Sequence, residues 1–401
     1  MTKFVRISVI AVIIFVIIFA CKSKSEISQN TNRRTSYPTV EKIRISQTGQ
    51  KQCYSEISEI IPCAGTGQDG ELKRGVAWPK PRFIVNRNGT ITDRLTGLMW
   101  ERTPLKRPVN WEEAFKQIGE LNERRFAGYK DWRLPNIIEL ASLANFGIDR
   151  QYVWLRNQGF NVFQGQLSLF WSGTTDHIAS KKDNSPDKYV YVFDLHNGSV
   201  GSGGKVGRVS FITTNLYIRS FVIGVRTTGQ GVIKLPRTGQ TKKYHVGDDG
   251  DLQMGVPIPK PRFIDNGNGT MTDRLTNLVW EKKPGNQKVN WEDALKRIKE
   301  LNLNRYAGYN DWRLPNIHEL LSLANYQIPL IKILKDEGFQ LSNNYAFWSG
   351  TTEIGRINKN IAGQPLTGYS WYMYMSDGSI ETREKINPNS EIYVIAVRGG
   401  S

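Results

Sequence analysis

The alternation of apolar and polar side chains predicts the same hairpin at two places in the chain. The dipeptides Asn88-Gly89 and Asn268-Gly269 are each followed by an alternating strand, which ends at Trp100 in the first case and at Trp280 in the second. An Asn-Gly pair readily adopts the positive-φ turn that joins two antiparallel strands. Each segment is therefore expected to form a β-hairpin.

Helical spacing follows each hairpin. Asn110 is a helix N-cap residue with Glu113 three positions later, and apolar residues then fall on one helical face at Ala114, Phe115, Ile118 and Leu121. Asn136 with Glu139 repeats the capping signature and predicts a second helix that runs to about Asn145. Short strands around Gly- and Asn-rich turns are expected after this second helix.

The chain repeats itself over most of its length. Residues 83–146 align with 263–326 at a constant offset of 180 without a gap, and 42 of these 64 positions are identical. A period this long indicates duplication of a whole domain rather than a solenoid. We expect copy 1 at residues 46–229 and copy 2 at 234–401. Each should fold as an equivalent globule of the α+β class, with two helices beside a small, mostly antiparallel sheet.

The first 45 residues have the pattern of an export signal and a tether. Basic residues precede an apolar run of 14 residues from Ile7 to Ala20, which is typical of a signal peptide, and Cys21 follows at once, as in a relaxed bacterial lipobox. We expect residues 1–20 to be removed, Cys21 to be lipidated, and residues 21–45 to form a flexible tether. An uncleaved signal anchor is the alternative. Both the lipidated form and the signal-anchored form place the protein in the cell envelope, and the outer membrane and the cell surface are the expected location.

The two remaining cysteines fit this oxidising location. Cys53 and Cys63 enclose a short polar loop that a disulfide would clamp, and no other cysteine or histidine lies close enough in sequence to suggest zinc.

A net charge of +17 points to an acidic partner. Because the chain is exported, we expect an acidic or sulfated polysaccharide or host matrix rather than nucleic acid. Membrane contact is expected through the N-terminal lipid, and a homo-oligomer is allowed.

Catalytic machinery is not expected. The four histidines lie at positions 177, 196, 245 and 318, and none recurs in the other copy, so no histidine couple for nucleophilic catalysis is repeated. Carboxylates do recur, and Glu101, Asp131 and Glu139 match Glu281, Asp311 and Glu319. A capping or ion-pair role explains these better than acid–base chemistry. The oxygen-rich segment 265–273 suggests either a calcium loop or a plain hairpin turn, and the turn is favoured because copy 1 has Arg87 within it. We expect neither metal nor cofactor.

Recurring tryptophans suggest carbohydrate stacking. Most should lie in the core, and one per copy is expected at a surface, with Trp132 and Trp171 as the better candidates in copy 1. The candidate ligand-binding residues are Trp132, Arg133 and Trp171 in copy 1 and Trp312, Arg313 and Trp348 in copy 2.

These motifs closely resemble the Lcl C-terminal domain family, which is named for the terminal domain of a bacterial collagen-like adhesin. The motifs are Thr48-Gly49-Gln50, Thr66-Gly67-Gln68-Asp69-Gly70, Pro81-Arg82-Phe83, Thr96-Gly97-Leu98-Met99-Trp100-Glu101, Asp131-Trp132-Arg133-Leu134-Pro135-Asn136, Phe170-Trp171-Ser172 and Gly224-Val225-Arg226. The resemblance implies a C-type-lectin-like fold, binding of sulfated glycosaminoglycans and adhesion, with no catalytic residues. Copy 2 departs from the pattern because it lacks both cysteines.

The leading interpretation is a lipid-anchored envelope adhesin with tandem lectin-like domains that bind acidic glycans or extracellular matrix. The alternative is a structural envelope lipoprotein that contacts cell-wall polymer or another envelope protein.

Overall fold

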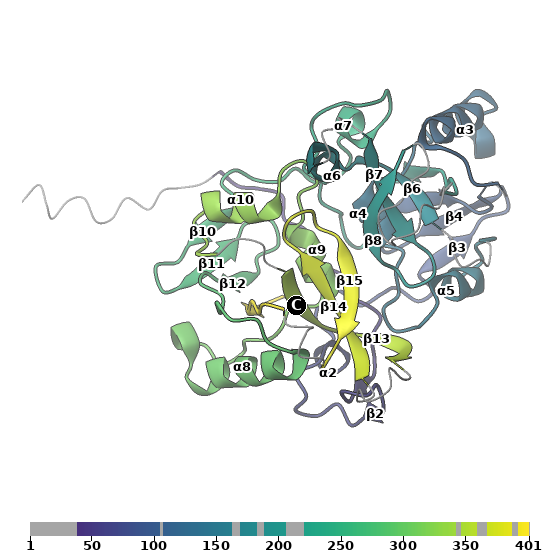
Figure 1. Ribbon diagram of the computed structural model, residues 1–401. Helices are drawn as coiled ribbons and strands as arrows, with labels where there is room; N and C mark the ends of the chain where they lie inside the picture. Colours follow the sequence, from purple (N-terminus) through teal and green to yellow (C-terminus); the bar gives the residue numbers. More distant parts are fainter. Residues whose placement is uncertain are drawn as a thin grey trace, which may run out of the picture. The chain divides into compact units, whose positions relative to one another are not determined.

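The computed structural model describes residues 38–104, 107–162, 169–182, 188–205, 220–341, 346–358, 367–386 and 392–400. The predicted signal peptide, Cys21 and most of the tether lie outside these ranges. Residues 41–401 form one compact unit (Figure 1). Within the described ranges, no helix combines the length and the apolar character needed to cross a bilayer.

Each copy contains the predicted hairpin within a four-stranded antiparallel sheet. In copy 1 the strands are β3 (Phe83–Val85), β4 (Thr90–Asp93), β5 (Leu98–Glu101) and β9 (Val225–Thr227), and in copy 2 they are β10 (Phe263–Asp265), β11 (Thr270–Asp273), β12 (Val279–Glu281) and β16 (Val397–Arg398). The last strand comes from the far end of each copy and pairs with the hairpin, as Trp100 does with Val225. The two ends of each copy are thereby held together.

Both predicted helices form in each copy, and their caps are those expected. Helices α3 (Trp111–Glu123) and α8 (Trp291–Leu303) begin after Asn110 and Asn290, whose side chains accept hydrogen bonds from backbone amides three residues on. Helices α4 (Ile137–Ala141) and α9 (Ile317–Leu323) begin after Asn136 and Asn316, each with a complete capping box. Helix α4 ends four residues before the predicted position.

The prediction of only two helices per copy is wrong. Short additional helices are α2 (Asp69–Leu72), α5 (Gln151–Asn157), α6 (His177–Lys182), α7 (Asp249–Leu252), α10 (Leu330–Asp336) and the 3₁₀ helices η1 (Phe126–Gly128) and η2 (Tyr306–Gly308). Each has at most seven residues. A helix of two turns or fewer is too short to produce a clear apolar period in the sequence.

The two copies share a six-stranded antiparallel sheet. Copy 1 contributes β6 (Leu169–Thr175), β7 (Tyr189–Asp194) and β8 (Val200–Gly204), and copy 2 contributes β13 (Ala346–Asn358), β14 (Thr367–Tyr374) and β15 (Ile380–Glu384). Strands β8 and β15 join the two halves through the antiparallel pair Val200–Ile380 (Figure 1). These two residues occupy equivalent positions at the offset of 180, so the sheet is continuous across a pseudo-twofold axis.

The hydrophobic core is also shared. One cluster of buried side chains includes residues of both copies, among them the fully buried Val200 and Ile380. Tyr191 of copy 1 packs edge-on against Tyr326 of copy 2, with ring centroids 4.7 Å apart, and the equivalent residues Trp371 and Phe146 pack in the same way at 5.0 Å. The expectation of two separate globules is therefore wrong, because the apolar faces of the two copies bury one another.

A segment before each hairpin, which we call an arm, crosses to the other copy. The first arm comprises residues 43–76 and the second arm residues 233–256. In the first arm, Asp69 is buried and accepts hydrogen bonds from Thr48 of the same arm at 2.6 Å and from Thr351 of copy 2 at 2.7 Å. The Gln50 side-chain nitrogen donates to the backbone oxygen of Thr352 at 2.7 Å, and the Gln50 side-chain oxygen accepts from the backbone nitrogen of Thr352 at 3.0 Å.

The second arm makes the same contacts with copy 1. Asp249 accepts from Thr238 at 2.6 Å and from Thr174 at 2.8 Å, and Gln240 bonds the backbone of Thr175 at 2.8 and 3.0 Å. The two arms are thus exchanged reciprocally. A buried carboxylate is tolerated only where such hydrogen bonds replace water.

The predicted disulfide between Cys53 and Cys63 is present in the first arm. It closes a loop that contains β1 (Cys53–Tyr54) and β2 (Ile60–Ile61). The offset between the copies changes from 190 at Thr48 to 180 at Phe83, so the second arm is ten residues shorter here. The loop contacts copy 2, where Lys385 Nζ donates to the backbone oxygen of Ser55 at 2.8 Å.

Glycine is required at position 70, where the first arm closes on itself. A Cβ at Gly70 would lie 1.9 Å from the backbone oxygen of Gln52, which cannot move aside as a side chain can. We expect Gly70→Ala to lower the free energy of unfolding by about 1–3 kcal/mol. Gly119, in the middle of α3, has no atom within 4 Å of the corresponding Cβ. Gly119→Ala should instead stabilise by about 0.5–1 kcal/mol. Urea unfolding measures the free energy of unfolding of both variants. Equal changes in the two would contradict a specific requirement for glycine at position 70.

The buried aspartates should make stability depend on pH. Burial raises the pKa of Asp69 to about 6 and that of Asp249 to about 7, whereas an unfolded aspartate titrates near about 3.9. The folded state therefore holds these protons more tightly, so their stabilising contribution is complete below about pH 4 and is lost as the pH rises through both folded values. We expect the thermal midpoint of wild type to decline from about pH 5 to about pH 8. The double variant Asp69→Asn, Asp249→Asn should decline less, and identical slopes would refute the effect.

Candidate functional site

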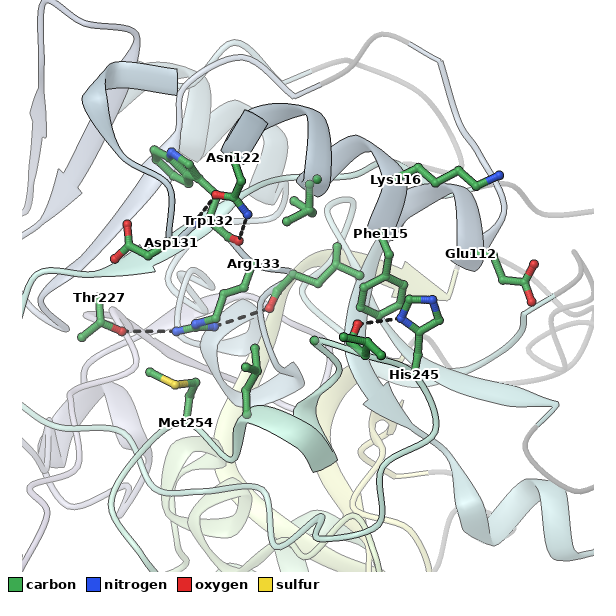
Figure 2. Close-up of a pocket in the computed structure, with 16 residues that line it drawn as sticks. Glu112, Phe115, Lys116, Asn122, Asp131, Trp132, Arg133, Thr227, His245 and Met254 are labelled. Carbon is green, nitrogen blue, oxygen red and sulfur yellow. Dashed lines mark hydrogen bonds between the residues drawn. The ribbon is translucent and has the colours of Figure 1, made fainter. Parts of the chain in front are cut away.

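A cleft opens on copy 1 where helix α3 faces the second arm. Its volume is about 770 Å³. Figure 2 shows α3 on one side, the loop 131–134 behind it, and His245 and Met254 of the second arm opposite. The lining residues are Glu112, Phe115, Lys116, Ile118, Gly119, Asn122, Asp131, Trp132, Arg133, Leu134, Thr227, His245, Val246, Gly247, Leu252 and Met254. The cleft is therefore lined by copy 1 and by the arm that precedes the hairpin of copy 2.

One asparagine of α3 fixes the loop that forms the back of this cleft. The Asn122 side chain donates to the backbone oxygen of Trp132 and accepts from its backbone nitrogen, both at 2.8 Å. The Trp132 indole is 3% exposed, and its Nε1 donates to the backbone oxygen of Phe126 at 3.0 Å. In Figure 2 the indole points away from Arg133 and Met254. Asn302 holds Trp312 in the same way in copy 2.

Arg133 lies at the wall of the cleft with its charge already neutralised. Two guanidinium nitrogens bond the two oxygens of Glu139, both at 2.6 Å, and Nη2 also contacts Thr227 at 3.3 Å. Glu139 completes the capping box of α4 at the same time, which rigidly connects the loop and the helix. Arg313 and Glu319 repeat this pair in copy 2. Such a bidentate pair positions the backbone and has little capacity left for a ligand.

The structure separates the six predicted ligand-binding residues into two groups. Trp132 and Arg133 line the cleft on copy 1, and Trp312 and Arg313 line an equivalent cleft on copy 2. Trp171 and Trp348 line neither cleft, and both are 0% exposed. The predicted surface position is wrong for all four tryptophans, because Trp132 and Trp312 are only 3% and 2% exposed, and strands β6 and β13 carry Trp171 and Trp348 into the core. There they donate to the backbone oxygens of Val109 and Val289.

The recurring carboxylates are held by structural partners. Glu101 is buried beside the backbone nitrogen of Gly224, and burial raises its pKa to about 7. Its equivalent Glu281 pairs with Arg297. Asp131 pairs with Arg226 at the edge of the cleft, and this ion pair lowers the pKa of Asp131.

The oxygen-rich segment 265–273 forms the turn and flanking strands of a hairpin. Asp265 makes an ion pair with Lys282 and accepts from the backbone nitrogen of Gly267. In the part of the chain that the structure describes, no three His, Cys, Asp or Glu side chains are grouped closely enough to hold a metal ion.

The cleft on copy 2 is smaller, with a volume of about 280 Å³. Its lining residues are Gly65, Thr66, Gly67, Glu71, Leu72 and Arg74 of the first arm and Leu295, Ile298, Lys299, Asn302, Asn310, Asp311, Trp312 and Arg313 of copy 2. Arg74 and Lys299 are exposed cations from different copies that converge here. Among the described residues, neither the Arg74 guanidinium nor the Lys299 ammonium group has a hydrogen-bond or ion-pair partner.

The two clefts share a framework and differ in their lining. Lys299 in copy 2 corresponds to Gly119 in copy 1, Arg74 corresponds to Met254, and Thr66 corresponds to Val246. None of these positions was predicted as a site. The information was present in the alignment of the two copies, because each is a position where an otherwise similar segment changes from a charged or polar residue to a small or apolar one.

Comparison with known proteins agrees with the internal repeat. The model of the family described as "Lcl C-terminal domain" matches residues 89–213 and 269–398, one segment in each copy and together more than half of the chain. No match is found among curated protein sequences. The chain belongs to the Lcl C-terminal domain family, of which it carries two copies in tandem.

Proposed function

We propose that this protein is a lipid-anchored adhesin of the cell envelope. Its two domains, of C-type-lectin-like fold, bind an acidic or sulfated polysaccharide such as a component of host matrix. The observation that carries the proposal is the convergence of Arg74 and Lys299 at the cleft on copy 2.

Arg74 and Lys299 are available for a ligand because the acidic side chains of the cleft, Glu71 and Asp311, bond other groups. Glu71 accepts from the backbone nitrogens of Gly65 and Gly67, and Asp311 pairs with Arg398. The two unpaired cations outnumber the single Glu71 carboxylate, which is held by neutral hydrogen-bond donors, so the cleft attracts a sulfate or carboxylate group. The cleft suits the charged group of a polymer better than a large buried ligand.

The net charge of +17 supports the same partner, since it draws a polyanion to the surface from a distance. Family membership adds to this argument, because the domain is named for an adhesin. The N-terminal pattern that ends at Cys21 supplies the expected anchor, which would hold the domains at the membrane.

Heparin chromatography over a salt gradient tests the cleft directly. We expect the full mature chain to elute above physiological salt. The double variant Arg74→Met, Lys299→Gly, which introduces the residues of copy 1, should elute at clearly lower salt because two charged contacts are lost. Arg87→Met removes one charge from the exposed turn between β3 and β4, outside the cleft, and serves as the control. If the double variant elutes with wild type, or if wild type elutes below physiological salt, the proposed binding site is rejected.

The proposed location has its own test. On intact cells, added protease should degrade the wild-type protein, because an adhesin must be exposed at the surface. Cys21→Ala removes the thiol that would carry lipid, so labelled palmitate should no longer be incorporated and the protein should leave the membrane fraction. Full protection from protease in wild type would favour a structural envelope protein that faces the cell wall.

A further inference from the structure

The cleft on copy 1 has an apolar interior. In Figure 2, Phe115 of α3 and Met254 of the second arm lie on different sides of the cleft. Its other large apolar lining residues are Ile118 of α3, Leu134 of the loop, and Val246 and Leu252 of the second arm. Val246 is 71% exposed and Leu252 is 39% exposed, although both are large apolar residues. The Phe115 ring stacks on His245 with centroids 4.0 Å apart, which closes one end of the cleft.

The charges around this cleft balance one another. Arg133 is paired with Glu139, and Asp131 is paired with Arg226. Glu112 and Lys116 remain exposed on α3 and have opposite signs. A charged ligand would therefore gain little here, and burying its charge against apolar walls would cost free energy. Charge complementarity favours a neutral ligand.

Comparison with copy 2 shows which part of the lining differs: Leu295, Ile298 and Leu72 keep the apolar character of Phe115, Ile118 and Leu252, whereas three other positions change. At the equivalent positions copy 2 has Lys299 in place of Gly119, Arg74 in place of Met254 and Thr66 in place of Val246. The cleft on copy 1, with Gly119 and Met254, has a volume of about 770 Å³. The cleft on copy 2, with Lys299 and Arg74 at these positions, has a volume of about 280 Å³. The larger volume lies within the range of small-molecule sites, roughly 300–1,000 Å³, and exceeds what a single side chain would fill.

We propose that the cleft on copy 1 binds a neutral, apolar small molecule, such as an aromatic ring system or an acyl chain. This site is separate from the polyanion site proposed for copy 2. Apolar contact with six hydrophobic side chains would provide the affinity. Two arms of different composition thus give the duplicated domain two ligand classes.

Nile red, a neutral apolar fluorophore, tests the proposal on the full mature chain. Wild type should bind it saturably with an increase in fluorescence. Gly119→Lys and Met254→Arg, which introduce the residues of copy 2, should each weaken binding by at least about tenfold. The Met254 backbone oxygen accepts from Asn136, and the Arg74 backbone oxygen accepts from Asn316 in the same way, so an arginine fits this backbone. Arg87→Gln changes an exposed residue in the turn between β3 and β4, outside both clefts, and should leave Nile red binding unchanged.

Heparin elution of the same proteins keeps the two proposals distinguishable. Gly119→Lys and Met254→Arg should elute at or slightly above the wild-type position, since each adds a cation. Thermal unfolding of each variant confirms that it is folded. The proposal is overturned if wild type gives no saturable Nile red signal or if both variants bind as tightly as wild type. Light scattering that shows a dimer blocked by these two variants would also overturn it, because a second copy of the chain would then cover the cleft.

Discussion

A buried aspartate that each arm shares with the other copy determines the arrangement of this molecule. Asp69 and Asp249 lie away from water, and each is satisfied by one threonine of its own arm and one threonine of the opposite copy. Half of these hydrogen bonds therefore come from the opposite copy, and a buried carboxylate that lost them would be costly. The exchanged arms thus link the two copies through their buried interiors. Each cleft has one wall from an arm and one from the opposite copy.

Local structure was predictable because its causes are local. The Asn-Gly hairpins, the caps at Asn110 and Asn136, and the pairing of Cys53 with Cys63 each depend on residues close in sequence. The contact of Asp69 with Thr351 was not predictable, because nothing in either segment marks a partner so distant along the chain. Burial of Trp171 was missed for a related reason: β6 lies at an edge of the shared sheet, and its local sequence does not reveal that distant segments, such as the one that carries Val109, cover this tryptophan.

The duplication preserved the framework of the clefts and altered what faces the solvent. The clamp of Asn122 on Trp132 and the pair of Arg133 with Glu139 recur in copy 2 with nearly the same geometry. These hydrogen bonds hold the loop after the first helix in the same way in both copies. Side chains that touch only the cleft are free to change, because their replacement leaves the framework intact. A rigid framework with a variable lining is how one fold acquires different binding properties.

The pairing of Val200 with its own equivalent, Ile380, has a consequence for assembly. Two separate chains joined through this edge would form a dimer whose population falls on dilution, as mass action requires. Covalent connection converts that encounter into an intramolecular one at a high effective concentration. The two unlike clefts are consequently always present in a ratio of one to one, however few molecules a cell carries.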